Sequence, residues 1–452
     1  MSALTLELGR FVADLSLNQI PAAGAAIART GIADCFGVLI AGSRDPEVAL
    51  IDRELGSASG AALASLVPSG ARRIAETAAL VNGVAAHVLD YDDVSLDGHP
   101  SAVLVPAILA QGEASGSSGA EMLTAYIAGF EVWAELLVRE PVPLHRKGWH
   151  PSAVLGTVGA AAACAKLRGL DARTTATAMA IAASMSSGLV ANFGTMTKSF
   201  QVGRAAQSGV IAARLAQAGL TASLDALEHP AGLLTALSVD GNAERDHPFS
   251  TAHKEWHIVS HGLNIKRYPI CYATHRSIDA ALDLVQRYDL TPGKVERIRV
   301  STGKTQMLML RNSAPQTGLE AKFSMQFAMA AALVARNVGL RELTDDFVRR
   351  PEVQAIFPRV VLEGTEVTRA GSNFAPFDAV EITTVGGEAL NSGPVEYAKG
   401  SHERPLSRDE LWVKFADCLG TEFSDSKKSR AFENLMMFDR LNGAGDLALQ
   451  HA

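Results

Sequence analysis

The segment 150–165 reads HPSAVLGTVGAAAACA and sets the pattern for more than half of the chain. Proline is favoured at the first helical position, so a helix should begin at Pro151. Gly156, Gly159 and Ala163 carry little or no side chain, which lets the axes of neighbouring helices approach closely. The segment therefore predicts a buried helix that packs on other helices, and it is too short to span a membrane.

Similar segments follow one another between about residues 5 and 255. Apolar residues recur at helical spacing, and short polar or Gly/Pro breaks separate the runs. Helices are expected at Ala22–Ala41, Arg73–Val88, Ser101–Gly112, Ala120–Val138, Ser152–Leu167, Ala172–Ser187 and Val202–Ala218. Together these helices predict one large all-helical domain.

The pattern changes after a polar stretch near residues 240–261. Alternating β-branched runs predict strands, and helical runs lie between and after them. The strands are expected at Val295–Val300, Val360–Leu362 and Ala379–Thr384, and the helices at His275–Tyr288, Ala321–Asn337, Ser407–Leu419 and Lys427–Arg440.

These patterns predict a mainly α, multidomain fold. Residues 1–258 and 395–452 are expected to form the helical domain, because the last two helical runs should pack back on the first part of the chain. Residues 259–394 are expected to form a smaller α+β domain. A length of 452 residues is also too great for one typical domain.

Composition excludes several classes of function. The formal net charge of −7 argues against nucleic acid as the main ligand, since such proteins carry a basic face. The cysteines form no CxxC pair, so neither a zinc knuckle nor a disulfide framework is expected. They lie at Cys35, Cys164, Cys271 and Cys418. Without a secretory signal pattern at the N-terminus, a reducing, cytoplasmic compartment is expected.

The pentapeptide His-Pro-Ser-Ala-Val occurs twice, at residues 99–103 and 150–154. Each copy places a histidine, His99 or His150, about where a helix cap belongs, beside unsatisfied N–H groups and the positive end of the helix dipole. Such a position attracts anions and disfavours imidazolium, so it favours a neutral ring that can accept a proton. The alternative is that His-Pro only starts a helix.

Three carboxylates, Asp90, Asp92 and Asp93, precede His99 in a stretch too polar to continue a helix. They could act as acid and base or bind Mg²⁺, although no partner carboxylate motif occurs elsewhere. For Asp92 and Asp93 a structural role, capping a helix or orienting a histidine, remains equally open. No metal site is expected, because the histidines lie singly on separate helices.

Cations follow in two places. Lys198 comes after the hydroxyl residues Thr195 and Thr197 and before a small-residue helix that contains Arg204, so it could hold a carboxylate or be a solvated loop lysine. The other place is the expected domain junction, where candidate ligand-binding side chains gather before a helix. They are Lys266, Arg267, Cys271 and His275. Packing is the alternative for Cys271, and a helix-start role for His275.

Several short motifs occur in one order along nearly the whole chain. They are Asp90-Tyr91-Asp92-Asp93 with Gly98-His99-Pro100, Gly148-Trp149-His150-Pro151, Gly194-Thr195-Met196-Thr197-Lys198, Lys266-Arg267-Tyr268-Pro269 with Thr274-His275, Glu320-Ala321-Lys322-Phe323-Ser324, and Lys399-Gly400. In this combination the chain resembles the MmgE/PrpD family, which includes 2-methylcitrate dehydratase, cis-aconitate decarboxylase and iminodisuccinate epimerase.

The resemblance implies a homodimeric enzyme that acts on a small di- or tricarboxylate without a metal or organic cofactor. It implies a pocket formed by five side chains, with the first four as catalytic candidates. They are Asp90, His99, His150, Lys198 and Lys266. As further substrate-binding candidates we take Arg267, Thr195, Arg204, Cys271 and His275.

Two positions depart from the family pattern. Cys271 stands where the decarboxylases carry histidine, and Phe327 stands where decarboxylases and dehydratases carry tyrosine. Since phenylalanine cannot donate a proton, the departures favour removal and return of a proton at one carbon. The expected activity is therefore epimerisation of an iminodisuccinate-like substrate. The alternatives are a dehydratase-like or decarboxylase-like lyase and a non-catalytic polycarboxylate-binding protein.

Overall fold

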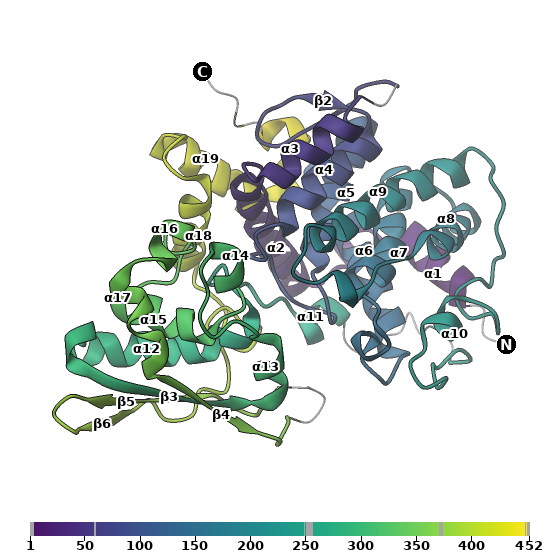
Figure 1. Ribbon diagram of the computed structural model, residues 1–452. Helices are drawn as coiled ribbons and strands as arrows, with labels where there is room; N and C mark the ends of the chain where they lie inside the picture. Colours follow the sequence, from purple (N-terminus) through teal and green to yellow (C-terminus); the bar gives the residue numbers. More distant parts are fainter. Residues whose placement is uncertain are drawn as a thin grey trace. The chain divides into compact units, whose positions relative to one another are not determined.

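The computed structural model describes residues 4–57, 60–247, 249, 256–369, 374–447 and 449 (Figure 1). The chain divides into two compact units. The first unit comprises residues 1–264 and 410–452, and the second unit comprises residues 265–409. The expectation of a mainly α fold with a large helical part and a smaller α+β part is confirmed.

The first unit is built almost entirely from helices. They are α1 (Leu4–Asp14), α2 (Ala22–Gly42), α3 (Pro46–Leu55), α4 (Ala75–His87), α5 (Pro100–Ser115), α6 (Gly119–Val138), α7 (Pro151–Leu167), α8 (Ala172–Met185), α9 (Thr197–Gln217), α10 (Leu233–Leu237), α11 (His257–His261), α18 (Arg408–Leu419) and α19 (Asp425–Met436). A short antiparallel hairpin, β1 (Ala64–Ser65) and β2 (Arg72–Arg73), lies beside them.

Small residues set the spacing of these helices. A Cβ on Gly159 of α7 would lie 2.8 Å from the Gly129 carbonyl oxygen of α6. A Cβ on Gly83 of α4 would lie 2.7 Å from the Cα of Gly203 in α9. Any larger residue at these contacts would force the helices apart, which confirms the close helix packing expected from the sequence.

Helix α2 has the length and apolar composition to cross a membrane, with a mean hydropathy of 1.4 in its most apolar window. However, 72% of that window is buried inside the structure. Gly31 shows the packing directly, because a Cβ there would lie 2.4 Å from Leu263. We therefore describe α2 as a core helix of the first unit.

Both His-Pro motifs begin helices, as expected. Pro100 and Pro151 are the first residues of α5 and α7, and His99 and His150 occupy the N-cap positions. The start expected for α9 was wrong: the helix begins at Thr197, five residues before Val202. No glycine or proline interrupts residues 197–202, so the helix extends to the end of the loop.

The second unit contains a four-stranded sheet in the order β4-β3-β5-β6. The strands are β3 (Val295–Gly303), β4 (Val360–Thr365), β5 (Ala379–Thr384) and β6 (Ala389–Asn391). Strand β3 pairs in parallel with β4 and antiparallel with β5, and β5 pairs antiparallel with β6.

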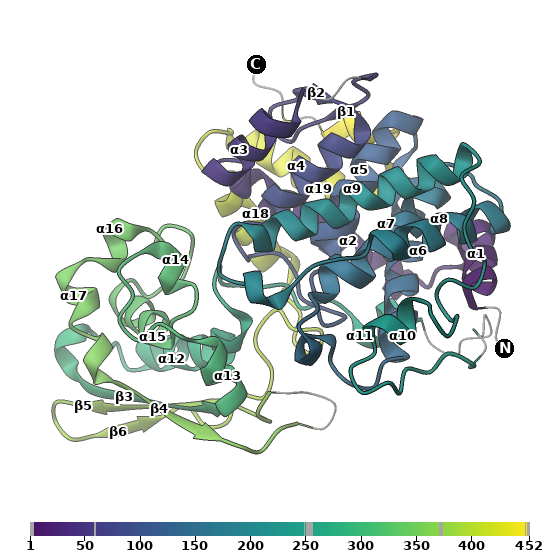
Figure 2. The same cartoon turned by 45° about the vertical axis from the view of Figure 1, so that its right-hand side comes forward.

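Helices α12 (His275–Arg287) and α15 (Met325–Val334) cover one face of this sheet (Figures 1 and 2). Ile298 and Val300 of β3 are buried in the core beneath them, whereas Arg299 between them is only half-buried. This alternation is the period-2 pattern of a sheet with one covered face.

Short helices complete the second unit. They are α13 (Lys304–Met309), α14 (Gly318–Ala321), α16 (Asp345–Val348) and α17 (Pro351–Gln354). The single helix expected at Ala321–Asn337 was wrong, since α14 ends at Ala321 and α15 begins at Met325. Ser324 explains the break, because its side chain caps α15 by accepting a hydrogen bond from the Phe327 N–H.

Residues 395–409 belong to the second unit, although the sequence pattern placed them in the helical domain. Val395 pairs with Asp378 in an isolated β-bridge. The Ile265 N–H donates to the Gly400 carbonyl oxygen at 2.7 Å. These backbone contacts join segments far apart in the chain, so local periodicity carries no sign of them.

A buried carboxylate should contribute strongly to the stability of the second unit. Asp378 is fully buried, and its Oδ1 accepts from Arg276 Nη2 at 2.8 Å and from Thr302 Oγ1 at 2.8 Å. We expect Asp378→Ala to lower the free energy of unfolding by about 3–5 kcal/mol, because Arg276 would be left buried without its partner. Urea denaturation followed by circular dichroism measures the change.

The matched control is the exposed pair between Asp283 and Arg287. Because both side chains are solvated, Asp283→Ala should cost no more than about 1 kcal/mol. Equal costs for Asp283→Ala and Asp378→Ala would contradict the assignment of a stabilising role to the buried pair.

Candidate active site

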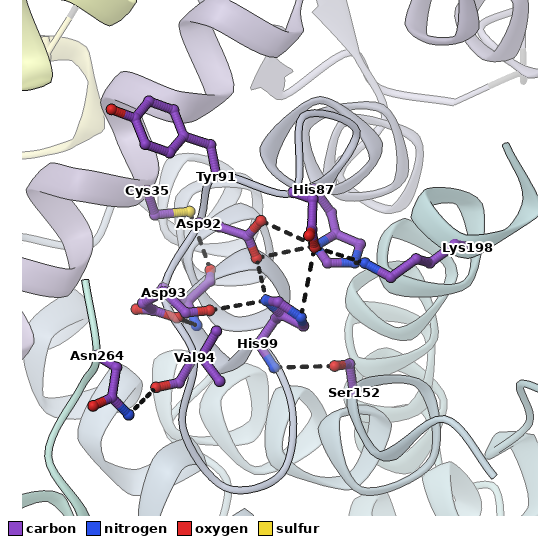
Figure 3. Close-up of polar contacts among 12 residues, drawn as sticks. Cys35, His87, Tyr91, Asp92, Asp93, Val94, His99, Ser152, Lys198 and Asn264 are labelled. Carbon is purple, nitrogen blue, oxygen red and sulfur yellow. Dashed lines mark hydrogen bonds and ion pairs between the residues drawn. The ribbon is translucent and has the colours of Figure 1, made fainter. Parts of the chain in front are cut away.

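Four helix ends of the first unit meet around one group of polar side chains (Figure 3). His87 is the last residue of α4, His99 caps α5, and Lys198 lies in the first turn of α9. The loop of residues 88–98 supplies Asp90 and Asp92. We call His87, Asp90, Asp92, His99 and Lys198 the acid–base cluster. The fourth end, the start of α7, places His150 beside it.

Asp92 is the shared hydrogen-bond acceptor of the cluster. Its Oδ2 lies 3.0 Å from His87 Nδ1 and 2.9 Å from His99 Nδ1. Figure 3 marks both contacts by dashed lines. Burial alone would raise the pKa of this carboxyl, but the two imidazoles hold the pKa well below its usual range. Asp92 is therefore a buried anion that two histidines compensate.

The contacts of His99 define its tautomer. Its Nδ1 lies 2.9 Å from Asp92 Oδ2 and 2.9 Å from the Asp93 carbonyl oxygen. Both partners can only accept, so Nδ1 carries the hydrogen. Nε2, which lies 4.0 Å from Asp90 Oδ1, is left to accept or donate a proton. The side chain is 13% exposed.

His87 has the same tautomer but a different task. Its Nδ1–H points at Asp92, and its Nε2 accepts a hydrogen bond from Lys198 Nζ at 2.8 Å. Burial and the Lys198 charge lower the pKa of His87 to about 4, against the opposing effect of Asp92. The ring is thus neutral near pH 7, and it connects Asp92 to the lysine.

Lys198 also contacts Asp90, whose Oδ1 lies 2.8 Å from Nζ. An ammonium group has three N–H donors, so one donor remains for a ligand after His87 and Asp90 are satisfied. Asp90 itself has a φ of 52°, in the left-handed region that residues other than glycine seldom adopt. Strained backbone of this kind is found preferentially at functional sites.

His150 lies beside the cluster and is held by Gln201. Its Nδ1 is 2.8 Å from Gln201 Oε1, while Gln201 Nε2 donates to the Leu189 carbonyl oxygen at 3.2 Å. The second bond fixes the amide orientation, so His150 Nδ1 must carry the hydrogen. Burial and the Lys198 charge lower the pKa of His150 well below its ordinary value. Its Nε2 is therefore a neutral acceptor.

Asp93 plays a structural part, which was one of the two roles left open by the sequence. Its carboxyl accepts from the Ser101 N–H at 3.2 Å and from the Ser101 hydroxyl, which lies 2.7 Å from the Tyr126 hydroxyl. Burial raises the pKa of Asp93 to about 8, and the nearby Asp92 and Asp34 carboxylates add to the rise. Asp93 is thus mostly a neutral acid near pH 7.

Four members of the cluster also bring possible metal ligands together. One ligand atom from each of His87, Asp90, Asp92 and His99 lies within 4.8 Å of the others. However, both histidine Nδ1 atoms already donate to Asp92, and the Lys198 ammonium contacts His87 and Asp90. A divalent cation would have to displace that ammonium group. The chemistry fits an internally neutralised acid–base site better than a metal site.

Two predicted binding residues of the first unit have other partners. Thr195 Oγ1 donates to the Asn192 carbonyl oxygen at 2.8 Å, and Arg204 Nη1 donates to Gln207 at 2.6 Å. The structure groups Asp90, His99 and Lys198 directly, with His150 adjacent. A substrate-binding role for Thr195 and Arg204 stays a prediction.

The remaining candidates belong to the second unit. Arg267 Nη1 lies 3.6 Å from Asp279 Oδ1. Cys271 is buried and its N–H donates to the Lys322 carbonyl oxygen at 2.9 Å. His275 is the first residue of α12, with its Nε2 3.1 Å from the Ile270 carbonyl oxygen. A substrate-binding role for these residues and for Lys266 stays a prediction.

Sequence analysis missed His87, Gln201 and His145. His87 ends a helix only three residues before Asp90, and this proximity to an acidic loop was the available signal. His145 lies 6.3 Å, between ring centroids, from Phe193, whose ring also packs on His150 at 4.9 Å. Burial lowers the pKa of His145.

The neutral state of Asp93 predicts a distinct pH dependence of stability. An unfolded aspartate has a pKa of about 3.9, so the folded chain holds one extra proton between about pH 4 and 8. This contribution to stability is complete below pH 4 and is lost as the pH rises. Asp93→Asn removes this pH-dependent contribution. The free energy of unfolding of the variant, measured relative to that of the native chain, should therefore rise by up to about 1.4 kcal/mol per pH unit between pH 5 and 8.

Asp171→Asn serves as the control for this measurement. Asp171 caps α8, and its hydrogen bonds to Thr174 lower its pKa, so it is ionised in both states above pH 5. Its variant should differ from the native chain by a constant amount between pH 5 and 8. If chemical denaturation gave parallel pH curves for Asp93→Asn as well, Asp93 would not be protonated in the fold.

Comparison with known proteins identifies two family domains along the chain. The sequence profile of the MmgE/PrpD N-terminal domain matches residues 6–246, and that of the MmgE/PrpD C-terminal domain matches residues 268–436. Together the two matched segments contain all members of the acid–base cluster and most of both units.

Cis-aconitate decarboxylases are similar to this chain. The human enzyme is 29% identical over 350 residues, which cover 75% of this chain and 71% of the enzyme. The mouse enzyme is 30% identical over 358 residues, covering 75% and 70%. An Aspergillus terreus enzyme is 24% identical over 471 residues, covering 99% and 95%.

Decarboxylases are lyases, so these relatives support the lyase alternative and do not support the epimerisation that the sequence departures favoured. They also make an enzyme a better interpretation than a non-catalytic binding protein. Because the two profiles span most of residues 6–436, the chain belongs to the MmgE/PrpD family.

Proposed function

We propose that this protein is a lyase that removes a carboxyl group from a small unsaturated polycarboxylate such as cis-aconitate, without a cofactor. The observation that carries the proposal is the state of His99. Its Nδ1–H is held by Asp92, and its Nε2 is left for proton transfer beside the Asp90–Lys198 ion pair. This is the arrangement of an oriented general acid or base.

Decarboxylation of cis-aconitate needs one proton donor and no redox partner. The bond between the methylene carbon and its carboxylate breaks, CO₂ leaves, and the released electron pair forms a new double bond. The pair of the original double bond moves to the carbon beside the distal carboxylate, and that carbon takes a proton. His99, when it carries a second hydrogen on Nε2, supplies this proton from Nε2 and keeps the Nδ1 hydrogen that Asp92 holds.

Lys198 compensates part of the negative charge of the substrate. Its remaining N–H donor can bind a substrate carboxylate and offset the charge that develops on the reacting carbon. Asp90 and His87 hold the ammonium group from two sides, each at 2.8 Å, so it is already oriented before the substrate binds. We assign Lys266 of the second unit as a further carboxylate-binding cation, on the family resemblance.

A dehydratase is the second candidate, because the structure holds one imidazole suited to each direction of proton transfer. The neutral His150 can accept a proton, while His99 beside Asp92 can donate one. Elimination of water needs a base that takes the proton from one carbon and an acid that protonates the hydroxyl group leaving the adjacent carbon.

Epimerisation was expected mainly because Phe327 carries no hydroxyl group. Its ring is fully buried in the apolar core of the second unit and packs edge-on against Phe347 at 6.3 Å between centroids. The groups that can transfer protons in the cluster all come from the first unit. The missing hydroxyl is therefore a weaker argument than the decarboxylase relatives. A homodimer and a cytoplasmic location are retained as parts of the proposal.

The reaction type can be tested in D₂O. The purified protein is incubated separately with cis-aconitate, 2-methylcitrate and iminodisuccinate, and products are followed by NMR. We expect CO₂ release from cis-aconitate with one deuterium on the product carbon that took the proton. Dehydration of 2-methylcitrate alone would move the assignment to the second candidate. Deuterium exchange into iminodisuccinate alone would contradict both lyase assignments.

The role of His99 predicts a large loss of activity on substitution. His99→Gln removes the proton donor while its amide can still contact Asp92, so kcat should fall by roughly 10²–10⁴-fold. The control is His229→Gln, since His229 is an exposed histidine of the same unit, and its kcat should stay at the native value. A kcat for His99→Gln within about twofold of native, at an unchanged Tm, would remove His99 from the mechanism.

A further inference from the structure

A lysine from the C-terminal part of the chain contacts the loop that carries Asp90 and Asp92. Lys414 lies on α18, more than 300 positions away in sequence, and its Nζ donates to the Tyr91 carbonyl oxygen at 2.8 Å. The same ammonium group lies 4.0 Å from the centre of the Tyr91 ring. One cation thus holds both the backbone and the side chain of the residue between two members of the acid–base cluster.

The charge of Lys414 is compensated in the interior. Nζ lies 2.6 Å from Asp34 Oδ1 on α2, and the two side chains are only 4% and 1% exposed. Helix α18 can approach α2 this closely because of Gly37, where a Cβ would lie 2.9 Å from the Phe415 ring. Asp34 and Gly37 are three residues apart, so they lie on one face of α2.

Stability alone is a poor explanation for this buried ion pair. Removing two charges from water is costly, and a well-packed apolar pair of similar volume is often as stable or more stable. The ammonium group does something that an apolar side chain cannot do: it donates a hydrogen bond to the carbonyl of Tyr91.

The Tyr91 carbonyl lies between Asp90 and Asp92 in the loop. Its peptide plane connects Tyr91 to Asp92, the shared acceptor of both cluster histidines. On the other side, Asp90 has the unfavourable φ of 52° and pairs with Lys198. A strained turn persists only where surrounding contacts hold it. Lys414 supplies such a contact at the centre of the turn.

We infer that Lys414 is a positioning residue of the acid–base cluster: by holding the Tyr91 carbonyl it fixes the turn that aims Asp90 at Lys198 and Asp92 at His99. The inference rests on the proposed function for its kinetic consequence only. Through Lys414, docking of α18 becomes a condition for correct geometry of groups from α4, α5 and α9.

The test uses the full-length chain and two readouts. Lys414→Met should lower kcat by roughly 10- to 100-fold, the loss expected when reacting groups shift by about 1 Å. It should also weaken or abolish the NMR signal of the His99 Nδ1–H, assigned by its loss in His99→Gln. Lys414→Arg, which keeps a donor and a positive charge, should restore part of both. The NMR readout needs no substrate, so it tests the inference even if the proposed reaction is wrong.

Two further variants separate positioning from stability. Asp34→Asn combined with Lys414→Met removes both buried charges, so it should fold even if the single variant does not, and it should keep the kinetic and NMR defects. Arg44→Met is the docking control, because Arg44 binds the Cys418 and Leu419 carbonyls at the end of α18 without touching the loop.

Arg44→Met should lower Tm while leaving kcat and the His99 signal at native values. Native kcat and an unchanged His99 Nδ1–H signal in the folded double variant would overturn the inference. Equal defects in Arg44→Met would overturn it too, since they would show that loose packing of α18 is sufficient.

Discussion

The hydrogen bonds from two histidines to one buried carboxylate, Asp92, set the chemical state of the whole site. Because Asp92 can only accept, it places a hydrogen on the Nδ1 of both His87 and His99. The Nε2 atoms of the two rings therefore have different roles. Nε2 of His87 accepts a hydrogen bond from Lys198, and Nε2 of His99 is left for proton transfer. Without the carboxylate, the tautomer of His87 would depend on Lys198 alone and that of His99 on the Asp93 carbonyl alone.

The fold provides the precision that these bonds require. The contact of Gly83 with Gly203 brings α4 against α9, and these are the helices that carry His87 and Lys198. A Cβ on Gly98 would lie 2.7 Å from Ser152 Oγ, so a similarly close contact joins the starts of α5 and α7. Small residues that look like simple core composition therefore also set the distances within the site.

Three carboxyl groups within four residues show how strongly tertiary surroundings govern chemistry. Asp92 is kept anionic by two imidazoles, whereas burial keeps Asp93 mostly protonated near pH 7. Asp90 is the ion-pair partner of Lys198. The residues share a local sequence and nearly the same place in the fold, so only the partners presented by distant segments separate their roles.

Local rules were sufficient for the helical fold class and the His-Pro helix starts, which follow from periodicity and from the preference of proline for the first turn. The resemblance to the MmgE/PrpD family selected Asp90, His99, His150 and Lys198 as catalytic candidates. Local rules fail at the start of α9 and at the break between α14 and α15, because helix ends are decided by capping and packing.

Tertiary structure alone decided which other residues join the site. In the sequence His87 is an ordinary helical residue, but in the fold its Nε2 lies 2.8 Å from Nζ of Lys198, 111 positions later. Gln201 became a partner of His150, and Lys414 a support of Tyr91, in the same way. Tautomers and protonation states depend on which polar atoms are in contact inside the protein. These contacts form by packing between segments that are far apart in the chain.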